Sequence, residues 1–293
     1  IWTPAAWPAL WGTERDYGFS TVAQKHAAGR RLYWPRGRTL GGSSAVNGMI
    51  YVRGHRADYD AWAYDGCLGW DYASVLPYFK KSENYEGGPD LFHGVGGPLN
   101  VARNGNPHPV CRAAVEAAIE SGFPFNADFN GADTLGVGYT DLTIKDGRRQ
   151  SAATAFLGPA SSRPNLSIRT DAQVLRLRLR KDRCVGVEVA VGGQVEIVAV
   201  RREVILSAGT IGSPQILMLS GIGNARALAA AGIDVIHPLR GVGRNLHDHL
   251  LCSVIFEARR DPPPPQNNFL ESQLFCKSDS RWLMPDLQPL FMH

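Results

Sequence analysis

The stretch that decides the fold is residues 36–54, which read Arg-Gly-Arg-Thr-Leu-Gly-Gly-Ser-Ser-Ala-Val-Asn-Gly-Met-Ile-Tyr-Val-Arg-Gly. It gathers Gly41, Gly42 and Gly48 among small polar residues, with arginines at both ends. A glycine has no Cβ, so its backbone comes close to a ligand and adopts positive φ angles. Consecutive N–H groups in such a turn form a concavity that fits phosphate oxygens. The stretch therefore predicts a phosphate-binding turn, against the alternative of a tight surface turn without a ligand.

Length and composition indicate a globular protein of one large or two ordinary domains. The chain has 293 residues, of which 44% are hydrophobic and 20% charged, with a formal net charge of +4. The basic residues are spread along the chain apart from short clusters such as 176–183, which argues against a nucleic-acid-binding face. No apolar run reaches the roughly 20 residues that a membrane-spanning helix needs.

The cysteines and the first residues bear on location and completeness. The five cysteines are odd in number, widely spaced and form no Cys-x-x-Cys pair, which predicts free thiols in a reducing compartment. We therefore expect a cytoplasmic protein, with attachment to a membrane surface as the alternative. Because the chain begins at Ile1 inside a Trp- and Pro-rich segment, we expect it to be a piece of a longer protein.

Helix signals occur at several places along the chain. Pro107 and Pro109 suit a first helical turn, alanines follow at helical spacing, and Gly122 can end the helix, so 107–122 is predicted helical. The glycine-rich stretch leads us to expect a short helix near 45–49, and the aromatic residues between 59 and 79 are expected in the core. Residues 123–150 and 262–265 are predicted loops. Further helices are predicted at 151–157, 214–219 and 224–231.

The clearest β signal is the strict alternation of leucine and arginine from Leu175 to Arg180. With the apolar runs 185–191 and 195–200 it predicts a three-stranded antiparallel meander, with the arginines on a solvated face. Residues 203–207 predict a short buried strand that leads into a second glycine turn, 208–214. In that turn Ser213 is expected to cap a helix with Pro214 at its first position. Residues 270–275 and 287–292 are predicted strands of another sheet.

Together the two glycine turns and their surroundings resemble a known family. Residues 41–49, and 209–214 with 220–223, are similar to the two signature stretches of the glucose–methanol–choline (GMC) oxidoreductases, flavoenzymes that oxidise alcohols. Residues 33–37, 53–60 and 241–249 are typical of the bacterial choline-dehydrogenase-like branch of that family. The resemblance runs along nearly all of the chain.

The resemblance implies bound FAD and assigns residues to three of its parts. Some members attach FAD through a histidine, and the matching residue here is Val46, which implies that the cofactor is held non-covalently. The cofactor residues that match are Thr39, Gly41, Gly42 and Ser43 at the pyrophosphate; Asn47, Gly48, Met49 and Ile50 beside the flavin ring; Val174, whose backbone meets the adenine; and Ala208 and Gly209, in the turn that closes over the cofactor.

Several departures from the family pattern limit the assignment. The first strand with its Gly-x-Gly-x-x-Gly turn is absent, and so is the late segment that supplies a histidine and a histidine or asparagine at the flavin. We therefore assign no catalytic residue in this chain. His247 and His249 lie in the block 245–249, which we interpret as structural. A metal site there is disfavoured because no third and fourth ligand is evident. Residues 41–45 lack the closing glycine of a serine-hydrolase nucleophile elbow.

The resulting prediction is an α/β fold with antiparallel sheets. Residues 1–250 are expected to form most of a GMC-type FAD-binding domain, with inserted substrate-domain segments around 60–150, and 251–293 the beginning of the substrate domain. The resemblance implies FAD-dependent oxidation of a small-molecule alcohol to an aldehyde or ketone, with oxygen or another electron acceptor. The alternatives are a flavin-containing hydroxynitrile lyase, or an inactive fragment with an incomplete FAD site.

Overall fold

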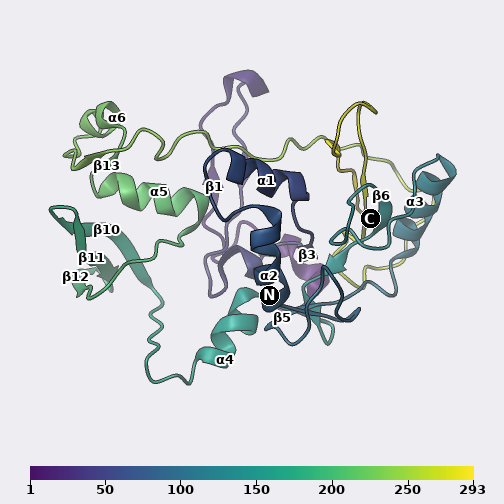
Figure 1. Cartoon of the computed structure of the whole chain (residues 1–293), viewed down its shortest axis with the longest axis horizontal. Helices are drawn as coiled ribbons and strands as arrows, with labels where there is room; N and C mark the ends of the chain where they lie inside the picture. The colour runs from purple at the N-terminus through teal and green to yellow at the C-terminus, as the bar shows by residue number, and fades with distance from the viewer. The chain divides into compact units, whose positions relative to one another are not determined.

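The chain folds into two units, of which unit 1 contains residues 1–166 and 257–293 and unit 2 contains residues 167–256. The computed structural model describes residues 1–293 (Figure 1). It is a mixed α/β structure with antiparallel sheets, as the sequence predicts. The predicted domain boundary at 250 concerns functional domains and stays a prediction.

Unit 1 is built from helices and many short strands. Its helices are α1 (Arg56–Tyr64), α2 (Tyr72–Ser82), α3 (Pro109–Glu120) and α4 (Gly158–Ala160), with the 3-10 turns η1 (Pro4–Ala6), η2 (Pro8–Leu10), η3 (Lys25–Ala27) and η4 (Gly42–Ala45) and the π-helical η5 (Ala153–Leu157). Its strands are β1 (Phe19–Ser20), β2 (Tyr33–Trp34), β3 (Ile50–Tyr51), β4 (Glu83–Tyr85), β5 (Leu99–Val101), β6 (Gly136–Tyr139), β7 (Asp141–Leu142), β8 (Ile144–Lys145), β9 (Arg148–Arg149), β15 (Ser272–Phe275) and β16 (Leu290–Phe291).

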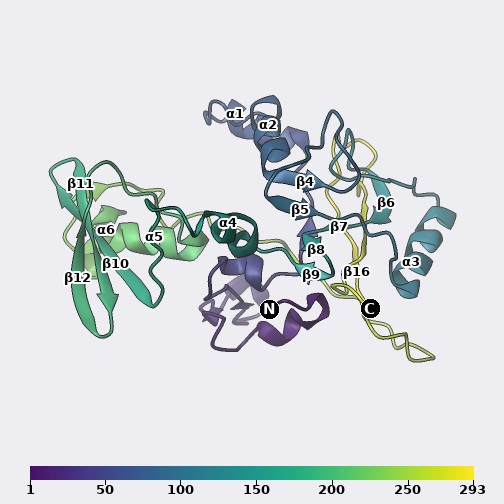
Figure 2. The same cartoon turned by 90° about the horizontal axis from the view of Figure 1, so that it is seen from below.

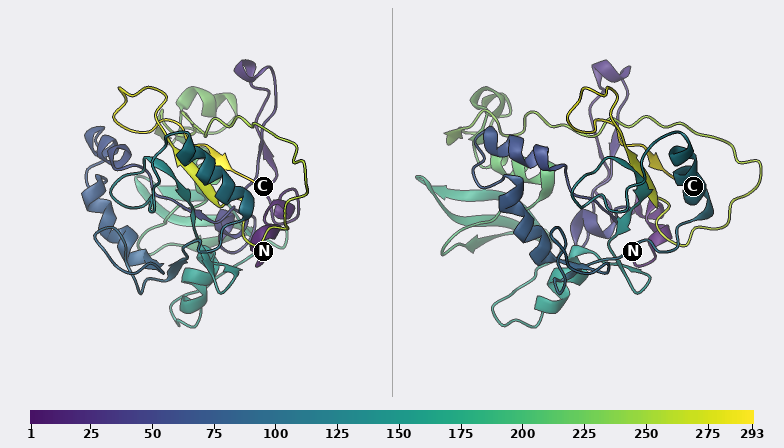
Figure 3. Two further views of the ribbon diagram at one scale, coloured as in Figure 1. Left: turned by 90° about the vertical axis from the view of Figure 1, so that its right-hand side faces the viewer. Right: turned by 45° about the vertical axis from the view of Figure 1, so that its right-hand side comes forward.

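One core of unit 1 lies between α3 and the antiparallel sheet β16-β15-β6 (Figure 3). Val115 of α3 packs there against Val137 of β6 and Leu274 of β15, and all three side chains are buried. The predicted helix at 107–122 is thus confirmed with bounds 109–120, and the two predicted strands are confirmed as β15 and β16.

A second core places the amino-terminal residues against the glycine-rich stretch. Trp7, Met49, Leu142 and Ile144 form this cluster. The Trp7 indole Nε1 donates a hydrogen bond of 2.7 Å to the carbonyl of Asn268. Strand β3 pairs with β7 and thereby connects the end of the glycine-rich stretch to this core.

Three predictions for unit 1 need correction. Residues 123–150 are not a plain loop, because their Gly and Asp residues form the turns of short strands: Asp146 and Gly147, both with positive φ, join β8 to β9. The expected helix at 45–49 is wrong, since the 3-10 turn spans Gly42–Ala45 instead. The aromatic residues are not uniformly core: Tyr72 is buried where it packs against Tyr59 of α1, but Tyr78 is 71% exposed.

Unit 2 contains the predicted meander, β10 (Ala172–Arg180), β11 (Arg183–Val191) and β12 (Gln194–Ala199), with α5 (Gly209–Leu219) beside it (Figure 2). The remaining elements are β13 (Ile222–Gly223), α6 (Ala225–Ala230) and β14 (His237–Pro238). Arg176 and Arg178 stay about half exposed and both pair with Glu188 across the sheet, which confirms the solvated arginine face. The predicted helix at 224–231 is confirmed as α6, capped by Asn224.

The expected buried strand at 203–207 is wrong. Its apolar pattern has no partner among the strands of the structure, so the segment forms no sheet and Ile205 is 78% exposed. Helix α5 begins at Gly209 and contains Pro214, so Ser213 is not its N-cap. The Ser213 hydroxyl instead accepts a hydrogen bond of 3.0 Å from the Ala208 N–H.

All five cysteines are free, in agreement with the prediction of unpaired thiols. None of the helices combines the length and the apolar character required to traverse a bilayer.

Candidate cofactor site

The site is built on the stretch 39–50, called here the glycine loop. Its turn begins where the Gly42 N–H donates to the Thr39 carbonyl at 2.9 Å. Gly41 and Gly42 have φ angles of +90° and +55°, which favour glycine. A Cβ on Gly41 would lie 3.1 Å from the backbone nitrogen of Ala153, so this residue must be small for the turn to pack against η5. A Cβ on Gly42 would meet nothing within 4 Å, so this glycine faces open space.

Two backbone donors of the turn have no acceptor. The N–H groups of Gly41 and Ser43 make no hydrogen bond in the structure, and Ser43 is exposed. The N–H of Gly42 between them is bonded to Thr39, so the two free donors are separated by one residue, and free N–H groups within one turn attract an anion such as a diphosphate. The space is open at the Cβ position of Gly42, whereas Gly37 packs against the Gly42–Ser43 peptide, where its Cβ would lie 2.9 Å from the Ser43 nitrogen. The turn therefore offers backbone donors of the kind that bind an anion, and its contact with the cofactor stays a prediction.

The second half of the glycine loop has an unusual backbone. Met49 is fully buried and has a φ of +61°, a conformation that costs a non-glycine residue about 1–3 kcal/mol. The surroundings hold it there: the Asn47 Oδ1 accepts from the Met49 N–H at 3.1 Å, and the Thr143 N–H donates to the Met49 carbonyl at 2.8 Å. The Asn268 amide also donates to the carbonyl of Gly48. Ile50 then begins β3.

Arg149 is a member of this site that the sequence did not reveal. Its Nη1 donates to the Ser44 carbonyl at 3.1 Å, to the Asn47 carbonyl at 2.7 Å and to the Asn47 Oδ1 at 2.9 Å. The residue is 1% exposed, and burial lowers the pKa of its guanidinium to about 10. Because it lies 102 residues from Asn47 in the chain, no local pattern could indicate this contact.

The other three predicted cofactor residues lie in unit 2. Val174 belongs to β10 and pairs with Val189 of β11. Ala208 precedes α5, and Gly209 is its first residue, with a φ of +77° and open space where a Cβ would stand. The eight residues of the glycine loop and these three therefore belong to different units. The predicted contact of all eleven with one cofactor stays a prediction.

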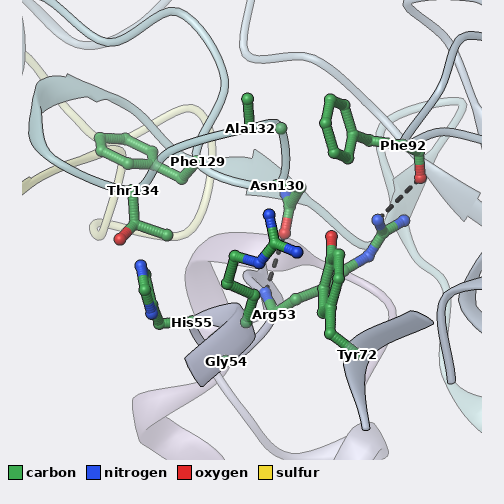
Figure 4. Close-up of a pocket in the computed structure, with 11 residues that line it drawn as sticks. Arg53, Gly54, His55, Tyr72, Phe92, Phe129, Asn130, Ala132 and Thr134 are labelled. Atoms are coloured by element: carbon green, nitrogen blue, oxygen red, sulfur yellow. Dashed lines mark hydrogen bonds between the residues drawn. The ribbon is translucent and has the colours of Figure 1, made fainter. Parts of the chain in front are cut away.

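Unit 1 also contains a buried charge network, formed by Arg53, Glu83, His93 and Asp128. The guanidinium of Arg53 pairs with the Glu83 Oε2 and also donates to the Phe92 carbonyl at 2.8 Å (Figure 4). The His93 ring lies 2.7 Å from Glu83 through Nδ1 and 3.1 Å from Asp128 through Nε2. Burial alone would lower the pKa of His93, but the hydrogen bonds to Asp128 and Glu83 raise it to about 9.

Residues near this network could hold a cation, which the sequence did not suggest. Ligand atoms of Asp90, His93 and Asp128 lie within 4.8 Å of one another. Both ring nitrogens of His93 are already hydrogen-bonded to carboxylates, so we describe the group as part of an ion-pair network. His247 and His249 lie outside this group, in an exposed segment of unit 2.

Comparison with known proteins gives the family. Residues 18–251 match the GMC oxidoreductase family. The chain is 48% identical over 270 residues to the oxygen-dependent choline dehydrogenase of Brucella anthropi, covering 92% of this chain and 48% of that protein. It is 47% identical over 251 residues to the human mitochondrial choline dehydrogenase, covering 85% of this chain and 42% of that protein.

Comparison with solved structures supports the same family. The crystal structure of pyridoxine 4-oxidase from Mesorbium loti superposes with a TM-score of 0.91 at 38% identity, covering 95% of this chain and 55% of that one. Formate oxidase gives a TM-score of 0.79 at 27% identity, covering 94% and 54%. The chain thus spans about half the length of the relatives it matches. It belongs to the GMC oxidoreductase family of flavoproteins and carries the FAD-binding amino-terminal domain of that family.

Proposed function

We propose that the full-length protein oxidises a small-molecule alcohol to an aldehyde or ketone, with oxygen or another acceptor taking up the electrons. FAD supplies the chemistry by accepting the hydride from the alcohol carbon. The observation that carries the proposal is the glycine loop, where the free N–H groups of Gly41 and Ser43 stand beside the open face of Gly42. Relatives named for choline and pyridoxine, which are both alcohols, support this substrate class.

In this proposal the chain's own residues bind and orient the cofactor. Thr39, Gly41, Gly42 and Ser43 hold the diphosphate, and the stretch from Asn47 to Ile50 lies along the flavin. Val46 is buried and carries no nucleophilic atom, so the cofactor is held without a covalent bond at this position. Val174, Ala208 and Gly209 of unit 2 complete the set. We assign no residue of this chain as the acceptor of the substrate proton.

We also propose a cytoplasmic location for the protein.

The experiment is anaerobic reduction of the full-length protein. It is purified with FAD and titrated with choline, pyridoxine, an aromatic alcohol and an aliphatic alcohol while the flavin absorption band is recorded. Bleaching by one of these alcohols, with the aldehyde or ketone recovered, is the expected result. A flavin band that persists with every alcohol while a cyanohydrin is cleaved would instead identify a lyase. A folded full-length protein that takes up no FAD would contradict the proposal.

The release of the cofactor by denaturation tests the non-covalent attachment. Acid precipitation should leave all of the flavin in the supernatant, because Val46 offers no atom for a bond to FAD. A variant with Val46→His provides the matched comparison at the position where some family members carry the linkage. Flavin that stays with the precipitated wild-type protein would contradict this part of the proposal.

A further inference from the structure

We propose that Arg149 is a positioning residue for the cofactor: it fixes Asn47 and the end of the Gly41–Ser44 turn in the shape that receives FAD. The inference rests on the proposed function of the glycine loop. It assigns the loop's geometry to a side chain that the loop does not itself contain.

The first step is the contact pattern. A single nitrogen of Arg149, Nη1, donates to the carbonyls of Ser44 and Asn47 and to the Asn47 side chain, at 3.1, 2.7 and 2.9 Å. These acceptors lie at the end of the 3-10 turn and at the start of the segment expected beside the flavin. One guanidinium therefore joins the two halves of the glycine loop.

The second step concerns the strained backbone of Met49. The Asn47 Oδ1, which Arg149 holds, also accepts the N–H of Met49. Positive φ at a buried methionine persists only when its surroundings impose it. Without Arg149 the Asn47 side chain loses a donor that keeps it in this orientation, and the Met49 backbone loses one of its restraints. The segment from Asn47 to Ile50 is then free to relax away from its present path.

The third step is the anchoring of Arg149 itself. Its Nε donates to the Ile1 carbonyl at 3.0 Å, and its backbone N–H donates to the Trp2 carbonyl at 3.0 Å. No carboxylate pairs with it, and its Nη2 is buried without a hydrogen-bond partner. A buried guanidinium without a counter-ion is unfavourable for stability alone. All the hydrogen bonds that its side chain donates go to backbone carbonyls or to the Asn47 side-chain amide. This pattern supports a role in fixing the conformation of the glycine loop.

Arg148 is the matched control. It is the neighbouring residue in β9, carries the same charge, and is exposed. Its guanidinium lies 5.5 Å from the ring centroid of Trp2 and makes no contact with the glycine loop. Substituting either arginine by methionine removes one positive charge and the guanidinium but keeps an unbranched apolar side chain in place of the arginine's methylene groups. The pair therefore separates the position of Arg149 from general charge effects.

The experiment measures the FAD dissociation constant of the full-length protein by flavin fluorescence, together with the urea unfolding of the FAD-free form. Arg149→Met should weaken FAD binding about ten- to one hundredfold, the loss expected for hydrogen bonds to a charged group, and shift the absorption spectrum of the remaining bound flavin. Arg148→Met should change the affinity by less than about twofold. An Arg149→Met protein that folds and binds FAD like Arg148→Met would overturn the inference.

If Arg149→Met does not fold, a second variant, Arg149→Lys, tests the inference. Arg149→Lys keeps the charge but replaces the planar fork by one ammonium group, which cannot reach the acceptors of the loop and Ile1 together. It should lose most of the affinity that methionine would lose, with an altered flavin spectrum. Wild-type affinity and spectrum in Arg149→Lys would overturn the inference. If the wild-type protein itself bound no FAD, the proposed function would fail, which is a distinguishable result.

Discussion

The glycine loop and the charge network lie in the same unit but differ in whether their polar groups have partners within the protein. In the network every charged group has an oppositely charged neighbour: Glu83 lies between Arg53 and His93, and His93 lies between Glu83 and Asp128. In the glycine loop backbone donors are left without acceptors. Removing one member of a buried ion pair leaves an unpaired buried charge, whereas a turn with free donors is suited to an external anion. The comparison predicts that changes in the network lower stability and changes in the loop lower cofactor affinity.

The largest effect is expected from Glu83→Gln in the network. The substitution leaves the Arg53 guanidinium buried without its carboxylate partner, and removing one member of a buried ion pair costs about 3–5 kcal/mol. The free energy of unfolding of the FAD-free protein in urea measures it. Glu120→Gln, on the exposed side of α3, is the control and should change stability by less than about 0.5 kcal/mol. If the two variants were equally stable, the charge network would contribute no more to stability than an exposed carboxylate, which would contradict this prediction.

The free energy of unfolding should depend on pH through the protonation of the His93 imidazole. Its pKa rises from 6.5 in the unfolded chain to about 9 in the folded one, because of the hydrogen bonds to Asp128 and Glu83. A raised folded-state pKa means that the stabilisation is fully present below pH 6.5 and is lost as the pH rises through 9. Asp141 also interacts with the charge of His93, and burial and the charge of Asp128 raise the pKa of Asp141 to about 6.

Unfolding in urea at several pH values between these limits measures the effect. The wild-type protein should lose on the order of 2 kcal/mol more than His93→Gln as the pH rises, since the variant has no imidazolium to lose. Parallel stability curves for the two proteins would show that His93 is not charged in the folded state.

The two glycines of the turn should separate stability from affinity. Gly41→Ala places a Cβ against the backbone of Ala153 and should lower the unfolding free energy by about 1–3 kcal/mol. Gly42→Ala adds only the cost of positive φ, about 1–2 kcal/mol, but its Cβ enters the open space that we assign to the diphosphate. We therefore expect Gly42→Ala to lose more FAD affinity, relative to its loss of stability, than Gly41→Ala does. An FAD affinity unchanged in Gly42→Ala would place the cofactor elsewhere.

The sequence predicted the parts of the molecule whose cause is local. The strict alternation from Leu175 to Arg180 correctly indicated one strand of the meander, and the small residues at 41–43 correctly indicated a turn. The segment 203–207 carries an equally clear apolar pattern, yet it forms no strand, because a strand also needs a hydrogen-bonding partner. Pattern alone does not supply one.

The parts that could not be predicted depend on contacts between distant residues. Arg149 reaches Asn47 across 102 residues, and Asp128 reaches His93 across 35 residues. Neither arginine nor histidine is marked by its neighbours in the sequence, since Arg148 beside Arg149 is exposed and contacts no part of the loop. The family resemblance predicted which residues of the loop contact the cofactor. It did not indicate Arg149, whose contacts with the loop appear only in the structure.

The most direct measurement of the central claim is hydrogen exchange of the full-length protein with and without FAD. The amides of Gly41 and Ser43 have no acceptor in the structure and should exchange rapidly in the FAD-free protein. When FAD is added they should become protected, together with the segment from Asn47 to Ile50, while the charge network around His93 stays unchanged. Tight FAD binding that leaves exchange in the glycine loop unaltered would contradict the account.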